Sequence, residues 1–248
     1  MYIQLNGIVV KETSMGECNR VINLLTDKRG IIKIFAKGVK SIRSKNSCMS
    51  QMFSYSELTL YEGRTGYTIN ESEVKEVFTG LGKDIYKLSL AQYFCEVMVA
   101  MAPKEEEAKD YLRLILNCFS YLENDKMNRD LIKSIFEMRL CTMSGYMPDL
   151  TGCRCCGQYN KENMYFSVYE SVLVCGNCLD KSYGSLVRLG GGTLESLRHI
   201  AYAPLERLFS FKASDKVILS LSGITERYLL DNSYTRYKAL DFYNSLNK

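Results

Sequence analysis

The sequence predicts an α+β protein of more than one domain, in which a small N-terminal β-barrel precedes an α-helical domain with a four-cysteine insert. Three observations favour this fold class. Residues 1 to about 80 show the pattern of short strands, helical spacing replaces that pattern after Gly82, and two C-x-x-C pairs interrupt the helices. A chain of 248 residues is long enough for one large domain or for two to three small ones.

Five short strands are expected in the first part of the chain, over residues 3–12, 19–27, 31–38, 53–63 and 65–78. The third strand alternates, and its two faces carry Ile32, Ile34 and Ala36 on one side and Ile31, Lys33, Phe35 and Lys37 on the other. The stretch EGRTG, at residues 62–66, is typical of a hairpin. Five short strands in this length suit a small barrel, and the OB type is one candidate. We therefore assign residues 1–80 to an OB-fold domain.

Helical spacing follows to the end of the chain, apart from the cysteine stretch. Asp84 has the side chain of an N-cap for a helix that ends before Pro103. Acidic residues open the next expected helix, over 104–124, which the helix dipole favours. Further helices are expected over residues 128–146, 193–203, 205–211, 214–232 and 235–248. Residues 81–248 thus form the predicted helical domain, with the insert at about 150–180.

The cysteine insert predicts a metal site. Cys153 and Cys156 form one C-x-x-C pair, Cys175 and Cys178 form the second, and eighteen residues separate the pairs. This spacing is typical of four-cysteine zinc fingers, because two sulfurs of one tight turn can bind the same ion. Four thiolates leave no open position for water, so we expect one structural Zn²⁺ rather than a catalytic one.

A fifth thiol, Cys155, is not needed by this pattern. It could replace Cys153 only as an adjacent C-C pair, whose side chains diverge, or form a strained vicinal disulfide with Cys156; we interpret it as a thiol outside the site. A thioredoxin-like redox centre is the alternative for the whole insert, but that chemistry uses one C-x-x-C at a helix start rather than two.

Basic residues are concentrated near the N-terminus, although the net charge of the chain is only +4. Between Asp27 and Glu57 the chain holds no acidic residue and seven basic ones: Lys28, Arg29, Lys33, Lys37, Lys40, Arg43 and Lys45. Such a span favours an anionic partner, nucleic acid first, and a solvated surface is the alternative. OB barrels bind single strands with basic side chains on phosphates and aromatic rings under bases, which would give Phe35 a stacking role unless it is a core residue.

The sequence contains no recognisable catalytic motif. The only histidine is His199, no H-x-E or C-x-E zinc-deaminase motif occurs, and no phosphate-binding glycine loop is present. The stretch LGGGT at residues 189–193 is interpreted as a helix-start loop. We expect a binding protein and no enzyme. The N-terminus lacks the order of a signal peptide, and no apolar run suggests a membrane span, so a cytoplasmic location without membrane contact is expected.

The N-terminal sequence GIVVKETSMGECNRVINLLTDKRGIIKIFAKGVKS resembles the N-terminal signature of the bacterial recombination mediator RecO, with GE-x-x-R, T-x-x-x-G and AKG in order. LTLYEG and CRCCG…CGNC also stand where many members carry a strand and a zinc finger. The order barrel, helices, four-cysteine insert, helices extends the resemblance over the whole chain. One departure is Asn19, where members often carry Asp; it leaves Arg20 with Glu17 as its only close acidic neighbour in sequence.

The resemblance implies a recombination mediator in DNA repair that binds single- and double-stranded DNA and anneals complementary strands. It also implies work with RecR, expected mainly on the barrel, to load RecA onto DNA coated by single-strand binding protein. The DNA-binding candidates are Arg20, Lys28, Arg29, Lys33, Phe35, Lys37, Lys40, Arg43 and Lys45. The helical domain would bind the C-terminal tail of single-strand binding protein, with basic candidates Arg113, Arg129, Lys133, Arg139, Arg198, Arg207 and Arg227. An RNA-binding zinc-ribbon protein is the alternative function, and a metal-dependent hydrolase is a third.

Overall fold

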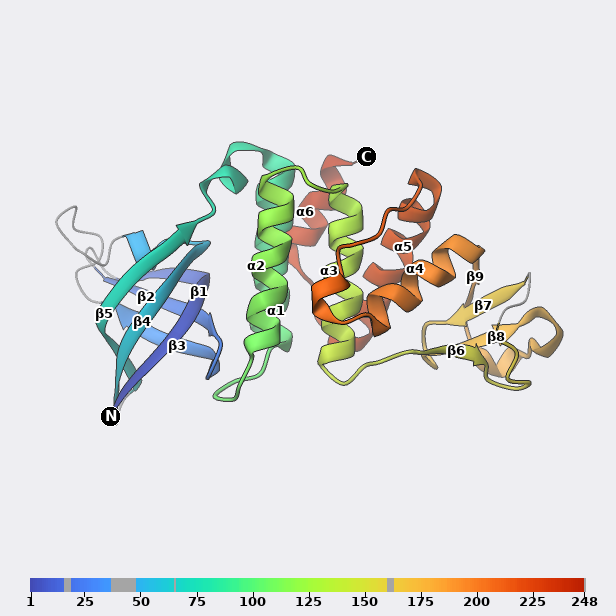
Figure 1. Cartoon of the computed structure of the whole chain (residues 1–248), viewed down its shortest axis with the longest axis horizontal. Helices are drawn as coiled ribbons and strands as arrows, with labels where there is room; N and C mark the ends of the chain where they lie inside the picture. The colour runs from blue at the N-terminus through green and yellow to red at the C-terminus, as the bar shows by residue number, and fades with distance from the viewer. Residues whose placement is uncertain (16–18, 37–47, 65, 160–162, 248) are drawn as a thin grey trace. The chain divides into compact units, whose positions relative to one another are not determined.

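The computed structural model describes residues 1–15, 19–36, 48–64, 66–159 and 163–247 (Figure 1). Four of the DNA-binding candidates, Lys37, Lys40, Arg43 and Lys45, lie outside these residues, as does Glu17. The chain forms two compact units: one of Met1–Lys126 with Tyr237–Lys248, and one of Met127–Arg236. Each unit is described separately below.

The first unit begins with a closed five-stranded barrel (Figure 1). Its strands are β1 (Tyr2–Met15), β2 (Asn19–Thr26), β3 (Gly30–Ala36), β4 (Ser54–Gly63) and β5 (Gly66–Val77). They follow one another around the barrel in the order β1-β2-β3-β5-β4, and all neighbours are antiparallel except β3 and β5. The expected OB-like barrel is thereby confirmed, and a short 3₁₀ turn, Cys48–Ser50, packs against it.

The alternation of β3 builds the barrel core as the sequence predicts. Ile32, Ile34 and Ala36 are buried, whereas Lys33 is exposed and Phe35 keeps 36% of its surface accessible. Phe35 is therefore not a core residue. Ile32 and Ile34 belong to the barrel core, which consists of Leu5, Val9, Ile22, Leu24, Ile32, Ile34, Met49, Leu58, Leu60 and Tyr67.

Three helices complete the first unit: α1 (Ile85–Met101), α2 (Lys109–Glu123) and α6 (Lys238–Leu246). Asp84 caps α1 as expected, since its carboxylate accepts hydrogen bonds from the backbone N–H groups of Tyr86 and Lys87. The C-terminal helix α6 is fastened to α1 by side chains of the latter. The Tyr86 hydroxyl donates to the Leu246 carbonyl at 3.1 Å, and Glu96 accepts from the N–H group of Ala239 at 3.2 Å.

The helix predicted from residue 104 begins only at Lys109. Residues 103–108 instead make backbone hydrogen bonds to the barrel. The Ile31 N–H group donates to the Pro103 carbonyl at 2.8 Å, and the Ala108 N–H group donates to the Asp27 carbonyl at 2.9 Å. These bonds hold the segment against the β2–β3 turn, so its acidic residues open no helical turn.

The second unit contains α3 (Arg129–Met143), α4 (Gly191–Tyr202) and α5 (Asp215–Ser233) together with a four-stranded sheet. The sheet has the order β6-β8-β7-β9, and its strands are β6 (Asp149–Cys153), β7 (Met164–Ser167), β8 (Val172–Cys175) and β9 (Leu186–Leu189). The sequence pattern does not predict β9. It predicts a helix over 205–211, where the structure has only the 3₁₀ turn Leu205–Arg207 after Pro204. The His199 ring bonds the Arg207 carbonyl at 2.9 Å, which holds this turn to α4.

Among the described residues, no helix is both long and apolar enough to cross a membrane.

Candidate metal centre and nucleic-acid surface

The first cysteine of each C-x-x-C pair lies at the end of a strand. Cys153 ends β6 and Cys175 ends β8, and these two strands are parallel neighbours with Cys153 opposite Leu173. Parallel neighbours end at the same edge of a sheet. The antiparallel pair β7–β8 forms a hairpin between the two C-x-x-C turns, called knuckles here, and it returns the chain to this edge.

The glycines of the two knuckles act differently. Gly157 has φ +72°, and its N–H group donates to the Cys153 carbonyl at 2.8 Å, so the turn uses the left-handed backbone that glycine adopts readily. Gly176 instead lies where there is little space for a side chain. A Cβ atom there would lie 3.3 Å from the Asn163 Cβ atom, and its N–H group donates to the Asn163 carbonyl at 2.8 Å.

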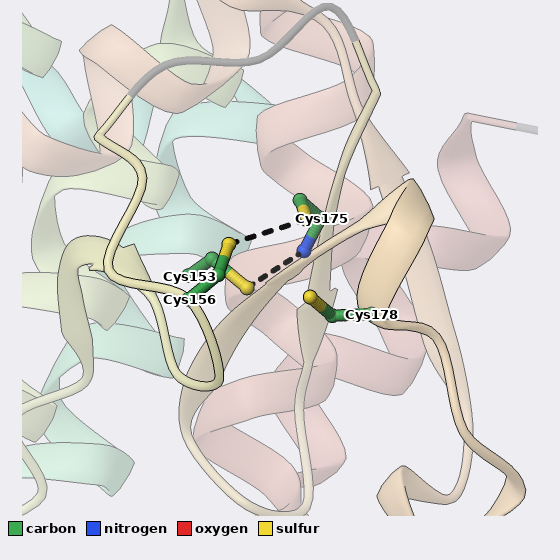
Figure 2. A group of neighbouring side chains, drawn as sticks. All are labelled: Cys153, Cys156, Cys175 and Cys178. Atoms are coloured by element: carbon green, nitrogen blue, oxygen red, sulfur yellow. Dashed lines mark hydrogen bonds between the residues drawn. The ribbon is translucent and has the colours of Figure 1, made fainter.

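The four expected ligands form one cluster (Figure 2). The sulfur atoms of Cys153, Cys156, Cys175 and Cys178 all lie within 4.8 Å of one another, and the sulfurs of Cys156 and Cys175 are 3.7 Å apart. Zn–S bonds of about 2.3 Å in a tetrahedron place sulfurs about 3.8 Å apart. The cluster thus has the size of a four-thiolate zinc site, and these residues could hold a metal ion.

Backbone N–H groups favour the thiolate form of Cys153. Burial raises the pKa of its thiol, but N–H groups of Cys156, Cys175 and Cys155 outweigh burial, and the pKa falls to about 6. The Cys175 N–H group, 3.3 Å from the Cys153 sulfur, is one of these donors (Figure 2). Metals bind the thiolate, so this backbone arrangement suits a ligand.

The fifth thiol, Cys155, is not part of the cluster. Its side chain is exposed, and its sulfur lies 2.9 Å from the Tyr183 hydroxyl. The interpretation of Cys155 as a thiol outside the site agrees with this geometry.

Arg198 of α4 anchors the polypeptide on both sides of the first knuckle. Its guanidinium donates to the carbonyl of Leu150 and to that of Tyr159, each at 2.8 Å, and to the Glu195 carboxylate at 2.7 Å. The guanidinium also lies 3.8 Å from the centre of the Tyr159 ring. A buried arginine with these partners fixes the knuckle relative to the helix.

The barrel carries the described DNA-binding candidates. Lys33 and Phe35 project outward from β3, two residues apart on one face. Arg20 is different, because its guanidinium pairs with Glu12 across the β1–β2 ladder at 3.2 Å and donates to the Ser50 carbonyl at 3.3 Å. In the sequence only Glu17 is a close acidic neighbour of Arg20; Glu12 comes close in the structure because β1 and β2 are antiparallel.

The candidates Lys28 and Arg29 lie in the β2–β3 turn. The Lys28 amine donates to the Gln4 carbonyl at 2.7 Å, and Arg29 lies 3.8 Å from the Glu62 carboxylate. Both side chains keep contact with solvent, so these surface bonds leave them able to meet an anion.

Lys11 and Lys104 are basic residues near Lys33 that the sequence pattern does not single out. Lys11, Asn23 and Lys33 stand opposite one another across β1, β2 and β3, and Lys104 bridges to Gly30 at the start of β3. Sequence alone would have shown this row only with the correct strand register.

Both parts of the chain match models of one family. Residues 1–78 match the model described as "Recombination protein O N terminal", and residues 82–241 match "Recombination protein O C terminal". The chain belongs to the RecO family of DNA repair proteins.

Its RecO relatives are similar over nearly their full length. A protein named DNA repair protein RecO from Acetivibrio thermocellus is 30% identical, over 100% of this chain and 98% of its own length. Proteins of the same name from Alkaliphilus metalliredigens and Bacillus pumilus are 27% and 28% identical, over 93% and 99% of this chain and 93% and 95% of their own lengths.

In this RecO-family chain, the basic candidates of the helical domain fall into two groups. Lys133, Arg139 and Arg198 are buried and bonded internally, so they are not surface contacts. The more accessible ones are Arg113, Arg129, Arg207 and Arg227. The sequence could not separate the groups, because the partners of the buried ones come from distant segments.

Proposed function

We propose that this RecO-family chain is a recombination mediator without catalytic activity of its own, working in the cytoplasm. It binds single- and double-stranded DNA, anneals complementary single strands and, with RecR, helps to load RecA onto DNA coated by single-strand binding protein. The C-terminal tail of that protein docks on the helical part of the chain. One Zn²⁺ held by Cys153, Cys156, Cys175 and Cys178 stabilises the finger and takes no part in chemistry.

One observation supports the DNA-binding part most directly. On a closed OB-type barrel, β3 turns Lys33 and Phe35 outward while Ile32, Ile34 and Ala36 are buried on its other face. A cation for phosphate beside a ring for base stacking is the combination that single-strand binders use. The basic sequence after β3, with Lys37, Lys40, Arg43 and Lys45, continues the same charge along the chain.

Strand annealing with and without single-strand binding protein tests the proposal. Lys33→Glu should lower affinity for single-stranded DNA about tenfold at moderate salt, because it replaces a phosphate contact with a repulsive charge. Lys83→Glu, an equal charge change at an exposed position outside β2 and β3, is the matched control. Equal losses for the two variants would contradict a role for the β3 surface.

Two further assays separate the alternatives. A strong preference for RNA in a competition between DNA and RNA of the same sequence would favour an RNA-binding protein instead. Strand cleavage in Mg²⁺ or Mn²⁺ would contradict the absence of catalysis. Annealing of strands coated by single-strand binding protein distinguishes a mediator from a general nucleic-acid binder.

A further inference from the structure

A groove of about 790 Å³ lies on the first unit, beside the row of Lys11, Asn23 and Lys33. Its walls come from β1, β2 and β3, from the start of β5, from α1, and from the segment that follows α1. That segment is held in place by the backbone bond between Ile31 and Pro103. The groove is thus built by regular elements and by a fixed connection.

The groove is apolar inside and basic at its rim. Val21, Ile31 and Val99 supply the apolar lining, and they are buried or half-buried. The rim holds three exposed lysines: Lys11, Lys33 and Lys104. Among the described residues, none of these lysines has an ion-pair partner. An apolar surface ringed by free cations suits a ligand with a flat, poorly solvated part and a negative charge beside it.

Asn23 gives the groove a recognition group. It lines the groove, its residue surface is only 8% exposed, and its side-chain amide has no hydrogen bond within the described part of the chain. Among the described residues, this amide is not one of the fully buried side-chain groups left without a partner, so it reaches solvent in the groove and is open to a ligand. The amide offers a carbonyl acceptor beside two N–H donors, the combination that pairs with the edge of a nucleic-acid base.

Tyr67 and Glu105 also line the groove, and they already form a hydrogen bond with each other. Tyr67 donates its hydroxyl proton to the Glu105 carboxylate at 2.5 Å. Burial and this hydrogen bond raise the pKa of Tyr67 to about 12, so the phenol keeps its proton at neutral pH. Glu105 would repel a phosphate, which leaves the lysine rim as the side where a phosphate enters.

We propose that this groove binds one unstacked nucleotide of single-stranded DNA, with its base against Val21, Ile31 and Val99 and its edge hydrogen-bonded to Asn23. The neighbouring phosphates lie on the lysine rim. The inference rests on the proposed function, because it names the place on the barrel that binds a base of the single strand in addition to its phosphates. A row of Lys11, Asn23 and Lys33 in cross-strand register points to the same path across the strands.

The test compares two probes with the same backbone: oligothymidylate of about 16 nucleotides, the upper site size of OB folds, and an abasic oligomer of equal length. The unaltered protein should bind oligothymidylate about tenfold more tightly, since the contact with Val21, Ile31 and Val99 and the hydrogen bonds to Asn23 both need a base. Asn23→Leu, similar in size, should remove most of this difference and leave abasic binding unchanged. Lys104→Ala should weaken binding of both probes by the same factor. Asn70→Leu, at an exposed asparagine of β5, should change neither.

The outcomes separate the groove from the proposed function. Equal affinity of the unaltered protein for both probes, or an unchanged difference in Asn23→Leu, overturns the groove site while DNA binding stands. Failure to bind either probe overturns DNA binding itself.

A second measurement needs no variant and so does not depend on how well Asn23→Leu folds. An oligothymidylate carrying 5-iodouracil is irradiated with the unaltered protein, and the crosslinked peptides are mapped by mass spectrometry. Crosslinks to residues 11–33 and 99–104 are expected. Crosslinks confined to other segments would overturn the proposal.

Discussion

Lys133, on α3, is 1% exposed, and two carboxylates neutralise it. Its amine lies 2.9 Å from Glu137 and 2.8 Å from Glu226, and the Thr225 hydroxyl donates to Glu137 at 2.7 Å. Burial lowers the pKa of Lys133, but the two carboxylates outweigh burial and raise it above its usual value. The side chain is therefore charged at neutral pH, and α3 and α5 are joined by an ionic network.

Lys133→Met should lower the free energy of unfolding by about 3–5 kcal/mol, because the fully buried Glu137 loses its cation. Urea denaturation followed by circular dichroism measures the change. Removing both charges, in Lys133→Met with Glu137→Leu, should recover much of the loss. Arg227→Met breaks an exposed pair with Asp231 on α5 and should cost only about 0–1 kcal/mol, so it serves as the control. A similar loss in Arg227→Met and Lys133→Met would contradict the network.

The sequence predicts such residues only in part. Glu137 follows Lys133 by one helical turn, so half of the network is visible in the sequence. Glu226 comes from another helix, and the carbonyl groups that hold Arg139 and Arg198 come from distant segments. Basic residues of a helical pattern are ordinarily surface residues, and their burial depends on tertiary contacts that the sequence pattern does not contain.

At the scale of elements, Gly30 controls how the segment after α1 meets the barrel. Its φ is +54°, and a Cβ atom there would lie 2.2 Å from the Pro103 carbonyl oxygen. A left-handed backbone alone costs an alanine about 1–2 kcal/mol. Gly30→Ala should lower the free energy of unfolding by more than this, because the collision with Pro103 adds to the backbone strain. Thermal unfolding measures the loss, and weaker single-strand binding should accompany it if the groove wall shifts.

A second glycine isolates the effect of backbone strain. Gly184 has φ +64°, and nothing lies within 4 Å of a Cβ atom built there. With ψ −140° as well, Gly184 lies in backbone space that glycine alone adopts readily; Gly184→Ala therefore carries backbone strain without the collision, and it should cost about 1–3 kcal/mol and leave DNA binding unchanged. If both variants lose the same free energy of unfolding, the close approach of Gly30 to Pro103 is not the reason why position 30 requires glycine.

The four-cysteine insert, which we call the finger, allows a prediction about zinc content and stability. Cys178→Ser should lower the zinc content, measured by elemental analysis, from about one per chain to a small fraction, because serine is a poor ligand for zinc. The melting temperature should fall by about 10 °C, since structural zinc contributes several kcal/mol to folding. Cys155→Ser removes a neighbouring thiol outside the cluster and should keep both the zinc and the stability. Loss of zinc at unchanged stability would contradict a structural role.

Elements were predictable where local chemistry determines them. Alternation gives the strands of the barrel, Asp84 gives the start of α1, and C-x-x-C spacing gives the four clustered cysteines. The predictions failed where the backbone finds partners elsewhere. Acidic residues before Lys109 suit a helix, yet the barrel takes their backbone groups, and β9 exists because β7 offers an edge to pair with.

At the scale of the whole molecule, the closed barrel follows from five strands in the length of one small domain, as the sequence predicts. The grouping of helices does not follow from sequence order. The compact unit with the barrel also holds α1, α2 and the C-terminal α6, because α6 packs on α1. A chain-order boundary near residue 80 remains a prediction about domains, and hydrophobic periodicity says nothing about which helices pack together.

This division leads to a prediction about metal removal. The cysteine cluster lies wholly within Met127–Arg236, whereas the barrel core and the groove belong to the other unit. A chelator that strips the metal should therefore loosen the finger and leave single-strand binding within about twofold of its starting value, since the described DNA-binding candidates all lie in the unit with the barrel. Limited proteolysis should cut first between residues 150 and 190, while a fragment that contains the barrel persists. Restoring Zn²⁺ should restore protection. If affinity for single-stranded DNA falls in step with metal loss, then the finger takes part in binding and the barrel does not act alone.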